Sequence, residues 1–277
     1  NPPPTPFLLL DTNACIAALT RAKHAVQVAN EARQQLAGNV RLLSLRPHAK
    51  SHKSLYLLTL GLLHGIHSHA VAKAGEAAAL LRQLTQCQQD CGAALPGSGP
   101  ACQGSAVACA ALAIQRRTNV SVDCTSPVCP SFSLLITSPI VTITALRHLA
   151  SAYQASSHST VAPHVDLHLV VQSRRHVSFL ANSLATDPTC RLLPTPLPVW
   201  VELDVGQART GASLDEAKEL LRLLPTVSSL RLVGVQAYAG HLQHLAGARA
   251  RRDAHAAALH QVWDLLAFGE SLGLGTL

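Results

Sequence analysis

Short apolar runs alternate with longer amphipathic stretches along most of the chain. Apolar side chains recur at helical spacing in residues 14–36, which predicts a helix, and residues 40–45 then alternate as in a strand. Further strands are expected to begin near Gly65, Phe132, Val165, Val199 and Leu230, and further helices to cover residues 54–63, 75–84, 143–155, 174–184, 213–224 and 250–272. Strands that alternate with helices are typical of parallel βαβ units, so the pattern predicts an α/β fold.

One segment interrupts this alternation. Residues 86–130 are rich in Gly, Pro, Ser, Ala and Cys and follow neither periodicity. Loops of this length are uncommon in compact domains. We therefore expect a disordered insertion between two parts of one domain, residues 12–85 and 131–277.

Composition narrows the class of protein. The chain has 277 residues, of which 48% are hydrophobic, so it can bury a large core. The formal net charge is +7, but charged residues are only 13% and no long basic run alternates with aromatics, so we do not expect nucleic-acid binding. The positive excess suits a phosphate-bearing cofactor and a carboxylate substrate. The longest largely apolar run, Leu55 to Leu63, is too short to cross a bilayer, so no membrane helix is expected.

The sequence does not begin with Met. We therefore expect the true N-terminus to lie further upstream, where a targeting peptide can have been removed. The compartment stays open between the cytoplasm and an organellar stroma or matrix.

A basic segment, Arg46-Pro47-His48-Ala49-Lys50-Ser51-His52-Lys53, follows the strand expected at residues 40–45. Pro47 has no backbone N–H and therefore ends ordinary strand pairing. Neighbouring positive charge and desolvation both lower the pKa of an amine such as Lys50, and a neutral amine can form a Schiff base with a carbonyl compound. The alternative is a solvated basic turn, which is the commoner origin of Lys-His pairs.

This segment resembles the Arg-Pro-His-x-Lys-Thr-His-Lys motif of the D-threonine aldolase and D-serine dehydratase family, with Ser51 in place of the usual threonine. Two later blocks also match in the same order, Glu202–Gly211 and Gln236–His244, and the last is more similar to the aldolases. The resemblance runs from about Thr5 to about Leu274. It implies an alanine-racemase-type, TIM-like (β/α)8 barrel that binds pyridoxal 5'-phosphate.

The resemblance also implies roles for individual residues. Lys50 carries the cofactor, and Arg209, Tyr238 and His241 contact it. His244 is expected to accept the proton of the substrate's β-hydroxyl, because histidine titrates near neutrality, and His241 is the alternative base.

Each of these residues also has a purely structural explanation. Arg209 can form a salt bridge to Glu202 or Asp204, Tyr238 can be a core aromatic, and His244 can be a histidine of the barrel rim.

The barrel is expected to be incomplete. Six strands can be counted from the lysine-bearing strand onward, and the chain ends at Leu277, where the resembling enzymes continue into a glycine-rich phosphate loop, two more strands and a C-terminal β domain. The strand expected within residues 1–11 would pair with that domain. Full-length enzymes of the family use a divalent metal, Mn, Mg or Zn, whose ligands lie there, so we assign no metal ligand here. His67 and His69 share a strand face but lack a third ligand.

The resemblance implies a pyridoxal-phosphate-dependent lyase that cleaves D-threonine and other D-3-hydroxy-amino acids to glycine and an aldehyde. One alternative is a D-serine dehydratase, which releases pyruvate and ammonia from D-serine. Another is an inactive, truncated barrel that only binds the cofactor or a partner. A homodimer is expected by analogy.

Overall fold

The computed structural model describes residues 12–37, 42–94, 132–157, 165–275 and 277. Its strands form one parallel sheet in the order β1-β2-β3-β4-β5. The strands are β1 (Ser68–Val71), β2 (Phe132–Ile136), β3 (Val165–Val171), β4 (Leu197–Leu203) and β5 (Leu230–Ala237). Because neighbours in the sheet are also consecutive in the chain, each connection crosses over in the same sense, as in a β/α barrel.

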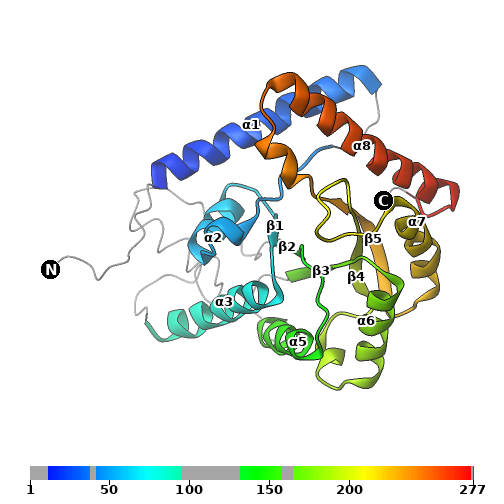
Figure 1. The fold of residues 1–277 in the computed structure, drawn as a ribbon. Helices are drawn as coiled ribbons and strands as arrows, with labels where there is room; N and C mark the ends of the chain where they lie inside the picture. Colours follow the sequence, from blue (N-terminus) through cyan, green and yellow to red (C-terminus); the bar gives the residue numbers. More distant parts are fainter. Residues whose placement is uncertain (1–11, 38–41, 95–131, 158–164, 276) are drawn as a thin grey trace.

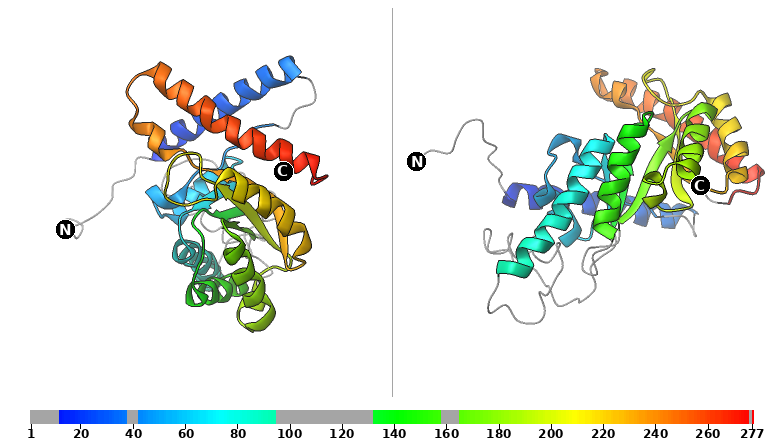
Figure 2. Two further views of the ribbon diagram at one scale, coloured as in Figure 1. Left: turned by 45° about the vertical axis from the view of Figure 1, so that its right-hand side comes forward. Right: turned by 90° about the horizontal axis from the view of Figure 1, so that it is seen from below.

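Helices surround this curved sheet on its outer side (Figure 1). They are α1 (Thr12–Ala37), α2 (Leu55–Leu63), α3 (Ala74–Ala94), α5 (Ile143–Ser157), α6 (Arg174–Thr186), α7 (Leu214–Leu223) and α8 (Ala248–Ser271). Helices α1 and α8 lie at the end of the molecule opposite α5 (Figures 1 and 2). The predicted α/β barrel fold is confirmed in these five consecutive β/α units. Within the described ranges, no helix is both long and apolar enough to cross a membrane.

Local sequence signals explain where several helices begin. Ser213 precedes α7. Its hydroxyl oxygen accepts a hydrogen bond from the backbone N–H of Glu216, and its own backbone N–H donates to the Glu216 carboxylate, which makes a capping box. Ser54 and Ser173 accept backbone N–H groups at the starts of α2 and α6. The core between sheet and helices is mainly aliphatic, with fully buried Leu134, Leu167 and Val199 on the central strands.

The strand expected at residues 40–45 is the main error of the sequence prediction. Residues 42–47 form no strand, and a single bridge joins His48 to Ala70 of β1. Asn30 of α1 explains the difference, because its amide bonds both the N–H of Leu43, at 2.6 Å, and the C=O of Leu43, at 3.0 Å. The Asn30 side chain thus forms hydrogen bonds with the backbone N–H and C=O of Leu43, with which a neighbouring strand would otherwise pair.

Several boundaries also differ from expectation. Helix α3 continues to Ala94, into the segment expected to be a disordered insertion from residue 86. Strand β1 begins at Ser68 instead of near Gly65. Strand β4 begins at Leu197, two residues before the expected start near Val199, because Pro198 lies within the strand instead of preceding it. The expected N-terminal strand and residues 95–130 of the insertion lie outside the described residues.

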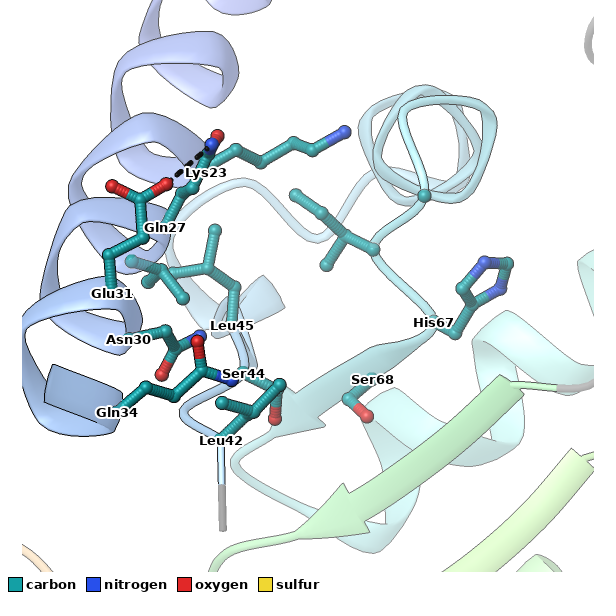
Figure 3. A pocket seen from close by; sticks show the side chains of 13 residues that line it. Lys23, Gln27, Asn30, Glu31, Gln34, Leu42, Ser44, Leu45, His67 and Ser68 are labelled. Carbon is teal, nitrogen blue, oxygen red and sulfur yellow. Dashed lines mark hydrogen bonds between the residues drawn. The ribbon is translucent and has the colours of Figure 1, made fainter. Parts of the chain in front are cut away.

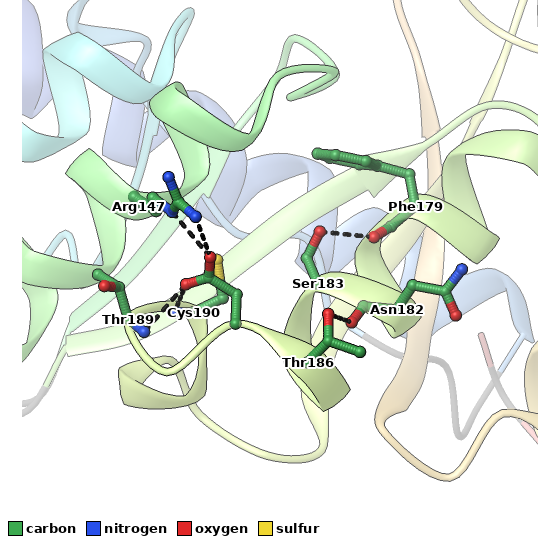
Figure 4. Close-up of polar contacts among 8 residues, drawn as sticks. Arg147, Phe179, Asn182, Ser183, Thr186, Thr189 and Cys190 are labelled. Atoms are coloured by element: carbon green, nitrogen blue, oxygen red, sulfur yellow. Dashed lines mark hydrogen bonds and ion pairs between the residues drawn. The ribbon is translucent and has the colours of Figure 1, made fainter.

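Arg147 of α5 lies near Thr189 and Cys190 of the loop that follows α6 (Figure 4). Asp187 joins α5 to this loop. Its Oδ2 accepts from Arg147 Nε at 2.7 Å and lies 2.6 Å from Nη2, while its Oδ1 accepts from the backbone N–H groups of Thr189 and Cys190. The Arg147 guanidinium, followed by the Cys190 N–H, lowers the pKa of the Asp187 carboxyl.

We expect Asp187→Asn to lower the melting temperature at neutral pH and to lower it less at about pH 3. The folded-state pKa of Asp187 lies below its unfolded value, so its contribution to stability is present above the unfolded pKa and is lost as the pH falls through the folded pKa. Thermal melts of both chains at the two pH values measure this. Glu219→Gln removes the exposed partner of Arg222 and is the control, with nearly no expected change. An equal loss at both pH values would contradict a charge effect.

Candidate functional site

A pocket of about 180 Å³ lies near the carboxyl ends of the strands. All three sequence blocks contribute to its lining: Arg46, His48 and Lys50 from the first, Glu202 and Arg209 from the second, and Gln236, Ala237 and Tyr238 from the third. Ala70, Leu135 and Thr137 complete it from β1, from β2 and from the residue after β2. Segments as far apart in the sequence as Arg46 and Tyr238 therefore meet in one place, which is where barrel enzymes carry their active sites.

Lys50 lies in a short 3-10 helix, η1 (Ala49–Ser51), and is exposed. His48 caps this helix, since its Nδ1 accepts the N–H of Lys50 at 3.1 Å. The other ring nitrogen lies 3.2 Å from Thr137 Oγ1. Burial, followed by the charge of Lys50, lowers the pKa of His48, so the ring is neutral with its proton on Nε2. A neutral histidine thus fixes the lysine backbone to the end of β2.

Arg46 holds the same segment from inside the barrel. Its Nη1 donates to Ser133 Oγ at 3.0 Å, and its guanidinium lies 5.7 Å from the ring centroid of Trp200. Trp200 Nε1 in turn donates to Nδ1 of the buried His168 at 3.0 Å. The lysine segment is therefore held mainly by side chains.

The aromatic ring of Tyr238 faces two cations. Lys50 Nζ lies 4.9 Å and Arg209 Cζ 5.3 Å from its centroid. Cations are attracted to the electron-rich face of an aromatic ring, so Tyr238 brings the amine and the guanidinium together. A Cβ on Gly240 would overlap this ring, so the glycine leaves room for it.

The loop after β4 presents Arg209. Asp204 organises this loop by accepting the N–H groups of Gly206, at 2.9 Å, and Ala208, at 3.1 Å. Glu202 accepts from Thr210 Oγ1 at 2.8 Å. The alternative explanation of Arg209 as a salt-bridge partner is therefore wrong, since neither carboxylate pairs with it and its guanidinium lies over Tyr238.

The two histidines of the third block lie in η5 (Gly240–His244), outside the pocket lining. His244 is exposed, and its Nε2 lies 3.1 Å from Gln243 Nε2. His241 donates its backbone N–H to Gln207 Oε1 at 2.7 Å, and its buried Nδ1 has no partner. Both roles, base and cofactor contact, stay predictions.

Sequence reasoning considered Glu202 only as a possible salt-bridge partner of Arg209 and gave no role to Gln236 or Thr137. Glu202 had a detectable signal, because it is a carboxylate within the otherwise apolar strand β4, and the structure leaves it only 2% exposed. Burial is the main cause that raises the pKa of Glu202. Thr137 directly follows β2, a position that faces the site in barrels of this kind.

Two larger hollows lie beside α1. One, of about 530 Å³, shares Arg46 and His48 with the Lys50 pocket, on the other side of the lysine segment. The other, of about 520 Å³, lies between α1 and residues 42–45 and is lined by polar side chains such as Gln27, Asn30 and Glu31 (Figure 3). Neither contains Lys50, Arg209 or Tyr238.

The histidine pair His67 and His69 is not arranged as a metal site. His69 is buried, and its Nε2 lies 3.1 Å from the C=O of Ile66. Burial lowers the pKa of His69 to about 4. Across the part of the chain that the structure describes, no group of three or more His, Cys, Asp or Glu could hold a metal ion.

Comparison with known proteins identifies the family of this chain and structures with a similar fold. The model of the alanine racemase N-terminal domain matches residues 29–271. The crystal structure of D-threonine aldolase from Filomicrobium marinum is 20% identical with a TM-score of 0.65, covering 98% of this chain and 53% of that one. Alanine racemase from D-cycloserine-producing Streptomyces lavendulae is 12% identical with a TM-score of 0.52, covering 93% and 48%.

An unknown protein from Bifidobacterium adolescentis is 13% identical with a TM-score of 0.52, and the match covers 98% of this chain and 85% of that one. The chain thus spans about half the length of the aldolase and racemase structures. No curated protein matches it. At these identities the similarity to solved structures shows the fold alone.

Proposed function

The chain belongs to the family of alanine racemase N-terminal domains, and on this premise we propose that it is a pyridoxal-phosphate-dependent lyase. Its proposed reaction is the cleavage of D-threonine and related D-3-hydroxy-amino acids to glycine and an aldehyde. The observation that carries the proposal is the meeting of Lys50, Arg209 and Tyr238 in one pocket. The likeness of the fold to a D-threonine aldolase and the three matching blocks support the choice of reaction.

The side chains of the pocket fit pyridoxal phosphate by their chemistry. Lys50 offers an amine for the aldehyde carbon, and Arg209 offers a guanidinium for an anionic oxygen of the cofactor or of the substrate carboxylate. Tyr238 offers an aromatic face, and Glu202 has a buried oxygen without a partner that can meet a polar ligand group. When bound, the cofactor supplies an electron-accepting ring for the carbon from which a bond is broken.

The chain's own residues would position the reactants and move protons. His48 holds the backbone of Lys50, and Tyr238 excludes water from one side of the amine. For the removal of the β-hydroxyl proton we keep His244, with His241 as the alternative base. Their position three to six residues after Tyr238 in the same block supports this assignment.

Product analysis tests the proposed reaction. The purified chain is incubated with pyridoxal phosphate, a divalent metal and D-threonine, and glycine is measured, with L-threonine as the control substrate. Glycine formed from D-threonine alone is the expected result, whereas pyruvate and ammonia from D-serine would identify the dehydratase alternative.

A barrel that binds the cofactor without turnover is the second candidate. Its support is the position of His244, which is exposed and outside the pocket lining. Cofactor binding with no product from either amino acid would identify it.

A further inference from the structure

Glu202 is a buried carboxyl group whose two oxygens have different surroundings. Oε1 accepts from Thr210 Oγ1 at 2.8 Å and from Gln236 Nε2 at 3.4 Å. Oε2 is fully buried and has no hydrogen-bond partner. An ionised carboxylate shares its charge between both oxygens, so burying one of them without a donor is costly.

The neighbouring Gln236 also has a buried side-chain oxygen without a hydrogen-bond donor. Its Nε2 donates both to Glu202 Oε1 and to the C=O of Thr137, each at 3.4 Å. These two acceptors fix the orientation of the amide, since a flipped amide would turn its oxygen toward both of them. Gln236 Oε1 is then left buried without a donor. Two adjacent side chains therefore each present an acceptor atom for which the structure supplies no proton.

The charged groups around Glu202 do not pair with it. Asp204 lies on the same strand end and repels a second negative charge, while Arg209 lies over Tyr238. Burial raises the pKa of Glu202, and the Thr210 hydroxyl, Arg209 and Gln236 only partly oppose this. The other ionisable groups that line the pocket are Arg46, His48, Lys50 and Tyr238.

We propose that Glu202 is a protonated carboxylic acid in the folded protein, with its proton on Oε2. This proton makes Oε2 of Glu202 a hydrogen-bond donor. The adjacent Gln236 Oε1 is the acceptor that lacks a donor, so one proton can satisfy both side chains. In this state Glu202 adds no negative charge to the wall of the pocket. Arg209 keeps its full positive charge for an anionic ligand, and Glu202 acts as a positioning residue. This last consequence rests on the proposed function, whereas the protonation state does not.

Infrared spectroscopy tests the protonation state without any cofactor. At neutral pH the chain should show the C=O stretching band of a protonated carboxyl, and Glu202→Gln should remove it. Glu219→Gln changes an exposed, paired carboxylate and should leave the band in place. An identical band in the parent chain and in Glu202→Gln would overturn the proposal.

A second measurement does not depend on the folding of a variant. In the parent chain labelled with 13C-glutamate, a protonated glutamate gives an isotope-shifted band. Two of the other glutamates, Glu76 and Glu216, have a lowered pKa and are ionised at neutral pH. The absence of a shifted band would overturn the proposal independently.

The consequence for ligand binding is measured with pyridoxal phosphate as the probe. We expect its affinity for the parent chain to fall by about tenfold as alkaline pH removes the Glu202 proton, beyond any fall seen in Glu202→Gln, which cannot ionise. Lys50 and Tyr238 are present in both chains, so the difference isolates Glu202. The same pH dependence in both chains would contradict the inferred role. If the probe binds neither chain, the proposed function fails while the infrared result still decides the protonation state.

Discussion

Lys50→Arg is expected to abolish covalent retention of pyridoxal phosphate and to reduce any turnover of D-threonine by at least about 10⁴-fold, as for the loss of other covalent catalysts. Lys50 is the residue of the pocket with a primary amine that can attack an aldehyde carbon. Arginine keeps the positive charge beside Tyr238 but has no such nucleophile. Borohydride reduction followed by mass spectrometry measures the attachment as an added mass on the peptide that contains residue 50.

Lys53→Arg is the matched control for this experiment. Lys53 lies three residues further along and pairs with Glu76 at 3.3 Å, and its side chain is 67% exposed. This variant should retain the label on Lys50. Labelling of Lys50→Arg at Lys53 to the level of the parent chain would show that the pocket does not select the amine, and would remove the basis of the proposed function.

The second large effect is expected for Gly211→Ala, which should destabilise the chain by about 3 kcal/mol. Gly211 has a φ of +106°, a conformation that side chains rarely adopt. A Cβ there would lie 2.6 Å from the backbone N of Asp204 and 2.9 Å from the C of Leu203. These are backbone atoms at the end of β4, so relief would displace the loop that presents Arg209. Urea denaturation measures the loss of stability.

Two glycines separate the causes of that effect. Gly273 also has a positive φ, +73°, but a Cβ there would meet no atom within 4 Å, so Gly273→Ala reports backbone strain alone. Gly75 lies in α3 with open space around it, and Gly75→Ala should be neutral or slightly stabilising. A cost at position 211 no greater than that at position 273 would show that the contact with Asp204 is unimportant.

The alternation of apolar runs and helical stripes was sufficient to predict most of the fold. The strands expected to begin near Phe132 and Val165 begin at these residues, since both are short, largely apolar runs. The prediction of a strand at residues 40–45 was wrong, because its outcome depends on a contact from another element and not on the local sequence pattern. Asn30, on another element, bonds the backbone of Leu43 and replaces the neighbouring strand.

The site was predictable only in part for a similar reason. Lys50, Arg209 and Tyr238 each stand in a block that resembles known enzymes. The second and third blocks lie at the ends of β4 and β5, and the bridge from His48 to Ala70 joins the first block to the same sheet. The protonation state of Glu202 depends instead on which hydrogen-bond donors lie near each of its carboxyl oxygens. This cannot be predicted from the sequence. The placement of the η5 histidines likewise depends on neighbours such as Gln207, which accepts the backbone N–H of His241.

One bridge, between His48 and Ala70, joins the backbone of residues 42–48 to the sheet, whereas seven residue pairs join β4 to β5. Opening the lysine segment therefore breaks few backbone hydrogen bonds and mainly costs the contacts of Asn30, Arg46 and His48. Local unfolding is thus easier next to Lys50 than between β4 and β5. The exposed side chain of Lys50 can therefore change position together with its segment while the rest of the barrel stays folded.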